Sequence, residues 1–535
     1  MKPTRLLLAV TLPLLLTACQ APEPSTPVPE PSEQESSSAQ ESDTAAEKPT
    51  QESTPTGSMP VLKIRTVSDA PDAMRFVTEP ITGFVAENIA SWTKGFQIPA
   101  EPYYEACTVT LPDGTEAAAD VKVRGNWTTW YPKKPLRLKF EEKQGLCGLN
   151  DGAEQKNWVL IASYKDFSLL RDKAALQMAG EILDADGLYA SDCALVEVEI
   201  NGEYWGVYTL AEQQQISGKR IDITKAEKDY AGTDIGYLME FDGYYVNEEP
   251  LQAFEMDYAD NAPLRSFNGD DTDSPMICPL NDGTNEYRQN TGITIDSDIY
   301  SQEQHDFIAS YMNNVYRILY YAAYEDKAYA FNADYTAIAP ADGMTPQQAV
   351  EAAVNVDSLA DMYIVSELTC DADIYWSSFF MDVDFGEGGD KRLTFEAPWD
   401  FDSSMGNKDR CADAKGFYAA SIVPDVNDNY ETINPWLAVL MQEDWFQVII
   451  REKWTAAYDG GVFTRMTDTI RKDSAAYADA FARSEARWQE VRQDSSIRNE
   501  LCRRSYKCKN QQEAADYLAG WIEDRVQFLN EYWHR

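Results

Sequence analysis

A β-hairpin is predicted by the stretch Val196-Glu197-Val198-Glu199-Ile200-Asn201-Gly202-Glu203-Tyr204-Trp205-Gly206-Val207-Tyr208-Thr209-Leu210. Apolar and polar residues alternate before the turn, as in a strand with one buried face. Asn201 and Gly202 tolerate the positive φ angles that a two-residue hairpin turn requires. The chain therefore contains an antiparallel sheet in its first half.

Working outward from this hairpin, the same alternation predicts strands at residues 61–65, 118–123 and 136–140. Helical spacing of apolar residues appears at 169–183, 304–321 and 356–368, and through much of 436–533. The polar region at about 245–290 is predicted to be loop or an irregular insertion. We expect an α+β fold with a strand-rich N-terminal part and a helix-rich C-terminal part.

Charge and histidine content exclude several classes of protein. The 535 residues include 46 Lys and Arg and 89 Asp and Glu, for a formal net charge of −43. This charge repels nucleic-acid phosphates, so no nucleic-acid partner is expected. The two histidines, His305 and His534, are too few for a multi-histidine zinc site. Acid–base or metal chemistry must therefore come from carboxylates.

The N-terminus has the pattern of an export signal. Basic residues in 1–5 precede the apolar run Leu6–Leu16, and Leu16-Thr17-Ala18-Cys19 follows. The last four residues resemble a bacterial lipobox, which implies cleavage after residue 18 and a lipid on Cys19; an ordinary cleaved signal is the alternative. We expect an exported protein, anchored in the cell membrane and facing away from the cytoplasm.

The segment after Cys19 is predicted to be a disordered tether. Residues 19–58 consist mainly of Pro, Glu, Ser, Thr, Gln and Ala without an aromatic residue, so they cannot bury enough apolar surface to fold. A folded domain is expected at 59–445 and a C-terminal helical extension at 446–535. The eight cysteines beyond Cys19 permit disulfides but do not define their pairing; Cys502 and Cys508 are the closest pair in sequence.

One segment is basic in this acidic chain. Arg124, Lys133, Lys134, Arg137 and Lys139 lie close together in sequence, next to Gly125. Such a group favours a polyanion such as a nucleoside triphosphate. The alternative is a solvated strand face whose lysines balance nearby glutamates.

Two acidic clusters are candidates for chemistry. The first, Glu367 to Ser378, follows an apolar helix and contains Asp373. The second is Pro398-Trp399-Asp400-Phe401-Asp402, where a strand is expected to end. Residues two apart in a strand share a face, so Asp400 and Asp402 could converge on a hard cation such as Mg²⁺. A turn or helix cap is the alternative. Asp384-Phe385-Gly386 spells the metal-binding tripeptide of protein kinases, but its glycine-rich context predicts a hairpin turn.

Five blocks in one order resemble the spore-coat CotH kinase family, over residues 60–445. They are Arg124-Gly125-Asn126 with Lys133-Lys134-Pro135; Asn157-Trp158-Val159-Leu160-Ile161-Ala162-Ser163-Tyr164-Lys165-Asp166 with Leu170-Arg171; Asn201-Gly202-Glu203-Tyr204-Trp205-Gly206-Val207-Tyr208-Thr209-Leu210-Ala211-Glu212; Gly236-Tyr237-Leu238-Met239-Glu240-Phe241-Asp242; and Pro398-Trp399-Asp400-Phe401-Asp402.

This resemblance implies an atypical protein-kinase-like fold and transfer of the γ-phosphoryl group of ATP to a hydroxyl of an exported or cell-surface protein, with Mg²⁺ or Mn²⁺. The implied catalytic residues are Asp373, as proton acceptor, and Asp400. The implied metal ligands are Asp400, Asp402 and Ser377, with Ser378 beside them. Arg124 and Lys134 would meet the nucleotide, and Glu212 would orient Lys134.

The chain also departs from kinase patterns. It lacks a His-Arg-Asp loop and a GxGxxG phosphate loop, and Asp371 stands where many family members have asparagine. The main alternative is a non-catalytic surface adhesin or scaffold that keeps the fold to bind protein or polysaccharide. A glycosidase using Asp373 and Asp400 is a third possibility, which the basic segment disfavours. The oligomeric state stays open.

Overall fold

The computed structural model describes residues 58–67, 73–267, 276–277, 292–410, 412–424 and 431–535. The predicted signal, Cys19, the tether, Cys278 and Cys411 lie outside these residues.

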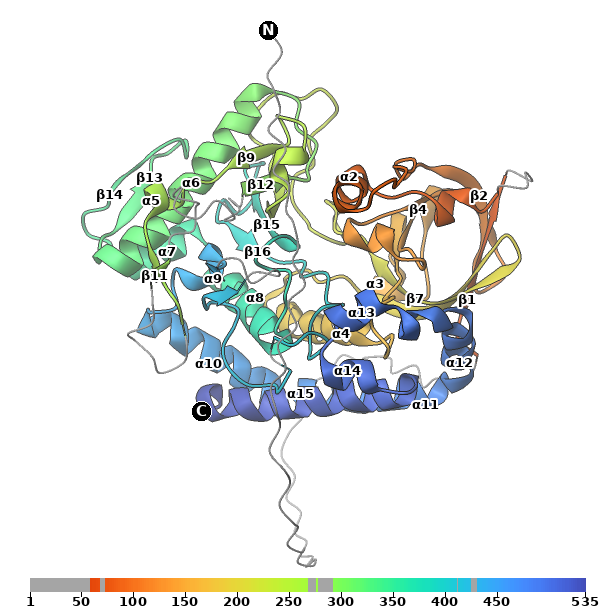
Figure 1. Cartoon of the computed structure of the whole chain (residues 1–535). Coiled ribbons are helices and arrows are strands. Elements are labelled where there is room, and N and C mark those ends of the chain that lie inside the picture. The colour runs from red at the N-terminus through yellow and green to blue at the C-terminus, as the bar shows by residue number, and fades with distance from the viewer. Residues whose placement is uncertain (1–57, 68–72, 268–275, 278–291, 411, 425–430) are drawn as a thin grey trace, which may run out of the picture. The chain divides into compact units, whose positions relative to one another are not determined.

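A closed seven-stranded barrel forms the N-terminal part (Figure 1). Its strands are β1 (Val61–Thr66), β2 (Glu105–Thr110), β3 (Glu116–Val123), β4 (Leu136–Gln144), β5 (Gln155–Ile161), β6 (Cys193–Ile200) and β7 (Glu203–Glu212), in the order β1-β2-β3-β4-β5-β7-β6. β6 closes the barrel by pairing parallel to β1. The predicted hairpin is confirmed: β6 and β7 are antiparallel, with φ of 51° at Asn201 and 81° at Gly202.

A five-stranded sheet lies beyond the barrel in sequence. Its order is β16 (Thr394–Phe395), β15 (Phe379–Asp384), β8 (Gly236–Asp242), β12 (Gly292–Ile295) and β9 (Ala253–Glu255). Asp384-Phe385-Gly386 begins the turn between antiparallel β15 and β16, as predicted. Short pairs are formed by β10 (Leu264–Arg265) with β11 (Met276–Ile277), β13 (Tyr329–Phe331) with β14 (Ile338–Pro340), and β17 (Val423–Pro424) with β18 (Glu431–Thr432).

Helices dominate the C-terminal part, as the apolar spacing predicts. The α-helices are α1 (Arg75–Thr78), α2 (Gly83–Trp92), α3 (Leu149–Gly152), α4 (Arg171–Leu183), α5 (Tyr258–Asn261), α6 (Gln302–Glu325), α7 (Pro346–Ala353), α8 (Val356–Thr369), α9 (Pro435–Ala438), α10 (Asp444–Asp459), α11 (Val462–Ala476), α12 (Ala478–Arg487), α13 (Ser495–Glu500), α14 (Arg503–Lys507) and α15 (Gln511–Trp533). Short 3-10 turns are η1 (Trp127–Trp130), η2 (Asp184–Asp186), η3 (Tyr245–Asn247) and η4 (Gln489–Gln493).

Two large hydrophobic cores hold most of these elements, and a small third cluster that includes Val85 and Ile89 packs around α2. One fills the barrel, with Leu136 and Leu138 of β4 among its buried residues. The other joins α8 and β15 to the C-terminal helices, and it includes Trp436, Trp454 and Trp533. The mixed α and β class is thus confirmed. In the part of the chain that the structure describes, no helix has the length and apolar character needed to span a membrane.

Cysteine pairing is partly visible. Cys502 and Cys508, the closest pair in sequence, are both free, as are Cys107, Cys147 and Cys193. Cys370 is disulfide-bonded.

Candidate active site

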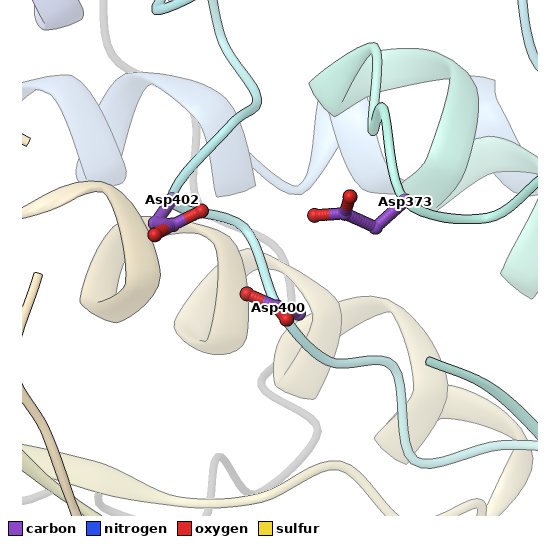
Figure 2. Close-up of side chains that lie close together, drawn as sticks. All are labelled: Asp373, Asp400 and Asp402. Atoms are coloured by element: carbon purple, nitrogen blue, oxygen red, sulfur yellow. The ribbon is translucent and has the colours of Figure 1, made fainter. Parts of the chain in front are cut away.

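Three aspartates form the centre of the site. Oxygen atoms of Asp373, Asp400 and Asp402, one from each carboxyl, lie within 4.8 Å of one another. Figure 2 shows the three carboxyls turned toward a common space, two from one loop and the third from the segment after α8. Convergent carboxylate oxygens suit a hard divalent cation. This is the only group of three or more potential metal-binding side chains that meets this limit among the described residues.

The end of α8 places Asp373. The helix ends at Thr369, and Cys370 adopts a left-handed conformation (φ 49°) whose N–H donates to the carbonyls of Glu367 and Ser366. Asp371 then accepts a hydrogen bond from the N–H of Asp373 at 3.0 Å. This tight exit from the helix fixes the direction of the Asp373 carboxyl.

A buried ion pair anchors the same end of α8 to α15. Glu367 and Arg525 are fully buried, with 2.6 Å between Oε1 and Nη2. Glu367 also accepts hydrogen bonds from the N–H groups of Tyr418 and Ala419. The C-terminal helix therefore contributes to the position of Asp373.

An irregular loop, not a strand end, carries Asp400 and Asp402. β16 ends at Phe395, and Asp400 has a left-handed backbone with φ of 66°. The side chain of buried Asn407 donates hydrogen bonds to the carbonyls of Asp402 and Lys165, at 2.7 and 3.3 Å. The predicted convergence of the two aspartates is found, but strand alternation does not produce it.

Lys165 is the cation nearest to Asp402. It lies just after β5, and its Nζ is 3.0 Å from Oδ1 of Asp402 and 2.6 Å from Oγ of Ser403. Burial disfavours its charged form, but the charges of Asp402 and Asp373 outweigh burial and keep its pKa well above the usual value. Lys165 thus counters the charges of Asp402 and Asp373.

The surplus of negative charge is visible in the carboxyl pKa values. Burial raises the pKa of Asp400 well above its usual value, and the charges of Asp373 and Asp402 raise it further. Burial also raises the pKa of Asp373, against the opposing charges of Lys165 and Lys408. Like charges this close coexist only with a proton or a cation among them. The donor set therefore fits a divalent metal such as Mg²⁺ or Mn²⁺.

A cationic face of the barrel lies beside the aspartates. We define it as Lys122, Arg124 and Arg137; Lys122 and Arg137 are cross-strand partners on β3 and β4, and Arg124 follows β3. The charge of Arg124 interacts with Asp400 and with Glu240 of β8. Burial and the charges of Arg137 and Arg124 lower the pKa of Lys122. This mutual repulsion marks a surface that would be stabilised by an anion.

Unpaired polar atoms border the same face. Asn126 Oδ1, Arg137 Nε, Gln213 Oε1 and Gln214 Nε2 are buried without a hydrogen-bond partner among the described residues. They come from the loop after β3, from β4 and from the segment after β7. Buried polar atoms are normally hydrogen-bonded. Donors and acceptors beside a cationic surface fit a nucleotide with its phosphates.

Two of the predicted nucleotide-binding residues do not lie on this face. Buried Lys134 donates to the backbone carbonyl of Thr129, and burial alone lowers its pKa, to about 8. Glu212 pairs instead with Arg220, at 3.0 Å. The predicted orientation of Lys134 by Glu212 is therefore wrong. The prediction fails because residues 127–135 form a turn and an irregular segment, which directs the side chain of Lys134 into the interior.

The remaining predicted residues lie around the trio. Ser377 donates its N–H to the carbonyl of Asp373 at 3.0 Å, so its backbone supports the turn, and its role as a metal ligand stays a prediction. Ser378 donates its N–H to Glu240 at 2.5 Å. The structure thus joins Asp373, Asp400 and Asp402, places Arg124 beside them, and adds Lys165.

The comparisons with known proteins agree with this part of the sequence analysis. Residues 121–529 match the family model described as CotH kinase protein. Since the match covers most of the chain, the protein belongs to the CotH kinase family. No curated protein matches the chain. The predicted family is confirmed, while the lipoprotein signal and the boundaries at 58 and 445 stay predictions.

Sequence reasoning assigned no role to Lys165 or Glu240, although both lie in the family-like blocks. The sequence offered one signal for Lys165, a lysine four residues after the end of β5 and next to Asp166. Asp166 accepts hydrogen bonds from the N–H groups of Leu170 and Arg171 and thereby closes the loop that presents Lys165.

Buried carboxyls elsewhere make stability depend on pH. Burial raises the pKa of Asp172 to about 7, of Glu396 to about 7 and of Asp361 to about 8. The folded state therefore holds protons that the unfolded chain releases above about pH 4. The stabilisation that these protons provide is complete below about pH 4. It is lost as the pH rises through the pKa values that the carboxyls have in the folded state.

Without divalent metal, the thermal unfolding midpoint should thus fall as pH rises from about 4 to about 7. Differential scanning calorimetry in EDTA measures it. A midpoint that rises steadily over this range would contradict the assignment of these carboxyls as protonated in the fold. Burial lowers the pKa of Lys133 to about 7, which opposes the decline only above that pH.

Proposed function

We propose that the protein is an atypical kinase that transfers the γ-phosphoryl group of ATP to a hydroxyl of an exported or cell-surface protein. The observation that carries the proposal is the convergence of three carboxyls within 4.8 Å, beside the charge of Arg124. Phosphoryl transfer requires positioning and charge neutralisation more than covalent chemistry, so carboxylates and cations suffice without histidine.

The residues divide into three roles. Asp400 and Asp402 would hold Mg²⁺ or Mn²⁺, which neutralises phosphate charge when bound. Arg124 and Arg137 would bind phosphate oxygens, and the unpaired atoms of Gln213 and Gln214 offer hydrogen bonds to the remainder of the nucleotide. Asp373, whose pKa is raised by burial, would orient the acceptor hydroxyl and accept its proton.

The alternatives explain the site less well. An adhesin does not require three convergent carboxyls, and burial raises the pKa values of Asp373 and Asp400, so their charged forms cost folding free energy. A glycosidase needs two carboxyls on opposite sides of a sugar, whereas three converge here. The cationic face has no role with a neutral sugar.

The location is part of the proposal. The signal pattern at 1–18 and the lipobox ending in Cys19 support export and lipid anchoring at the extracytoplasmic face of the membrane. The acceptor would then be another exported protein. The acidic net charge supports no role with nucleic acid.

The direct test is phosphate transfer. The purified protein is incubated with γ-labelled ATP and Mg²⁺ or Mn²⁺, alone and with a library of peptides that contain Ser, Thr or Tyr. We expect metal-dependent label in the protein or in peptides, sensitive to EDTA. A folded protein that neither binds ATP nor incorporates label with either metal would overturn the proposal and favour the adhesin.

The role of Lys165 gives a separate prediction. Lys165→Met removes the counter-charge of Asp402, so in EDTA it should destabilise the protein by about 1–3 kcal/mol. Mn²⁺ should then raise the unfolding midpoint of the variant more than that of the parent, because the ion replaces the missing positive charge. Thermal unfolding with and without Mn²⁺ measures both effects.

Lys472→Met serves as the control, since Lys472 is an exposed lysine on α11. The prediction is contradicted if Mn²⁺ raises the unfolding midpoint equally in the Lys165 variant, the control and the parent. Lys165 and the metal would then not interact with the same carboxylates.

A further inference from the structure

Two connections of the barrel, which contain α2 and η1, carry an exposed aromatic surface. We define it as Trp92, Phe96, Trp127 and Trp130, from the end of α2, the segment after it and the two ends of η1. The three tryptophans are 54%, 39% and 41% exposed. Single exposed apolar residues are ordinary on protein surfaces, but contiguous ones mark interaction sites.

The rings of the aromatic surface contact one another. The indoles of Trp92 and Trp127 stack, with ring centroids 6.2 Å apart and 3° between their planes. Phe96 meets Trp130 edge to face, at 5.8 Å and 66°. Trp127 and Trp130 are the first and last residues of η1, so one turn joins the two pairs. The aromatic surface is therefore continuous.

The two elements that carry the rings are fixed to each other. Thr82, directly before α2, donates its N–H to Oγ1 of Thr129 in η1 at 3.1 Å. Its hydroxyl donates to the carbonyl of Gly125 at 2.8 Å. Val85 and Ile89 of α2 are buried in a small apolar cluster. Rigid rings on fixed elements lose little conformational entropy when a partner binds.

The aromatic surface continues to the turn that carries Asp373. The side chain of Trp127 interacts with the hydroxyl of Tyr244, and the charge of Asp373 acts on the same hydroxyl. Gly243, directly before Tyr244, donates its N–H to the carbonyl of Trp376 at 2.5 Å. Trp376 donates its N–H to the carbonyl of Asp373 at 2.8 Å. A partner on the aromatic surface would therefore lie next to the proposed proton acceptor.

The chemistry of the rings favours a polypeptide partner. The four side chains are uncharged, so they stabilise a complex chiefly by burying apolar area. One pair of rings is parallel and the other is tilted by 66°, so the rings form an uneven surface and not a flat platform. Uneven aromatic surfaces accommodate protruding side chains, and Trp is enriched among the residues that dominate binding between proteins. Beside Asp373, that polypeptide is the segment with the acceptor hydroxyl.

We propose that the aromatic surface binds the acceptor protein through apolar or aromatic side chains that flank the hydroxyl to be phosphorylated. This inference rests on the proposed kinase function and adds a substrate class to it. The substrates are Ser, Thr or Tyr sites in an apolar context.

The test uses the full-length protein and two sets of fluorescein-labelled peptides, each with one Ser, Thr or Tyr. In the first set, one position within about five residues of that hydroxyl is Trp, Phe or Leu; in the second set, the same position is Gln. Fluorescence anisotropy without ATP measures binding, and γ-labelled ATP with Mg²⁺ measures transfer. We expect apolar peptides to bind about tenfold more tightly than their Gln counterparts at one or two positions.

Two variants connect this preference to the aromatic surface. Trp92→Ala and Trp130→Ala should each weaken binding of the apolar peptides about tenfold. Both should raise the KM of these peptides by a similar factor while kcat and ATP affinity stay unchanged, because the rings touch the acceptor and not the reacting atoms. Tyr300→Ala removes a ring that is 38% exposed elsewhere, and it should behave like the parent.

Several results would overturn the proposal. The first is equal binding of the apolar and Gln peptides, or equal binding by the parent, Trp92→Ala and Trp130→Ala. A loss of ATP affinity in Trp92→Ala would assign the aromatic surface to the nucleobase. Binding of soluble xylan that the same variant loses would assign it to a glycan.

This proposal and the proposed function fail separately. Label incorporation by a protein that binds none of the peptides would overturn the docking surface alone. Peptide binding that depends on Trp92, without label incorporation under either metal, would overturn the kinase activity and still support the docking surface.

Discussion

Asp400→Asn is expected to lower the rate of phosphate transfer from ATP by at least about a hundredfold, the scale seen when one preorganised charge contact to a transition state is lost. Asp400 lies between Asp373 and Asp402, and burial with these two charges raises its pKa well above its usual value. Replacing it with a neutral amide removes the ligand best placed to share a divalent cation. The measurement is the initial rate of label incorporation with Mg²⁺.

The same substitution should not unfold the protein. Because the Asp400 carboxyl is disfavoured as an anion in its buried setting, the amide should preserve or raise thermal stability without metal. Asp409→Asn removes an exposed carboxylate nine positions later and is the matched control, with a rate like that of the parent. Retention of activity in Asp400→Asn would remove this aspartate from the mechanism.

Arg525→Ala is expected to destabilise the fold by about 3–5 kcal/mol, because it leaves the carboxyl of Glu367 buried without its counter-ion. Arg525 also donates to the backbone carbonyls of Glu367 and Gly416. These contacts join α15 to the end of α8, so the loss should loosen the segment that carries Asp373. Urea unfolding at neutral pH measures the change.

An exposed ion pair between α11 and α15 gives the comparison. Arg471 and Glu523 lie 2.7 Å apart with 40% and 51% of their side chains exposed, so Arg471→Ala should cost at most about 1 kcal/mol. The double variant Arg525→Met with Glu367→Gln should recover part of the lost stability, because no unpaired charge stays buried. Similar losses for Arg525→Ala and Arg471→Ala would show that the C-terminal helix does not anchor α8.

Much of the fold could be predicted because it depends on local patterns. Alternation and the Asn201-Gly202 turn predicted β6 and β7, and apolar spacing predicted α4, α6 and α8 to within a few residues. The five blocks predicted the family, which the match over residues 121–529 confirms. Proximity in sequence does not predict disulfide pairing here, because Cys502 and Cys508 are close in sequence and both are free in the structure.

The sequence predicted those site residues that lie close together in one loop. It did not predict roles that depend on the direction in which a side chain points. Asp400 and Asp402 were identified together, and the family resemblance added Asp373. Lys134 was expected to meet phosphate, yet the turn before it directs its ammonium to the carbonyl of Thr129. Lys165 could not be assigned, because its contact with Asp402 joins positions 237 apart in the chain.

The most direct test of the central claim is Mn²⁺ binding, measured by electron paramagnetic resonance with and without a non-hydrolysable ATP analogue. We expect Mn²⁺ to bind at the trio, to bind more tightly with the nucleotide, and to lose this coupling in Asp400→Asn and in Arg124→Ala. Mn²⁺ binding that is indifferent to the nucleotide, or unchanged in Asp400→Asn, would contradict a metal–triphosphate site between the aspartates and the barrel.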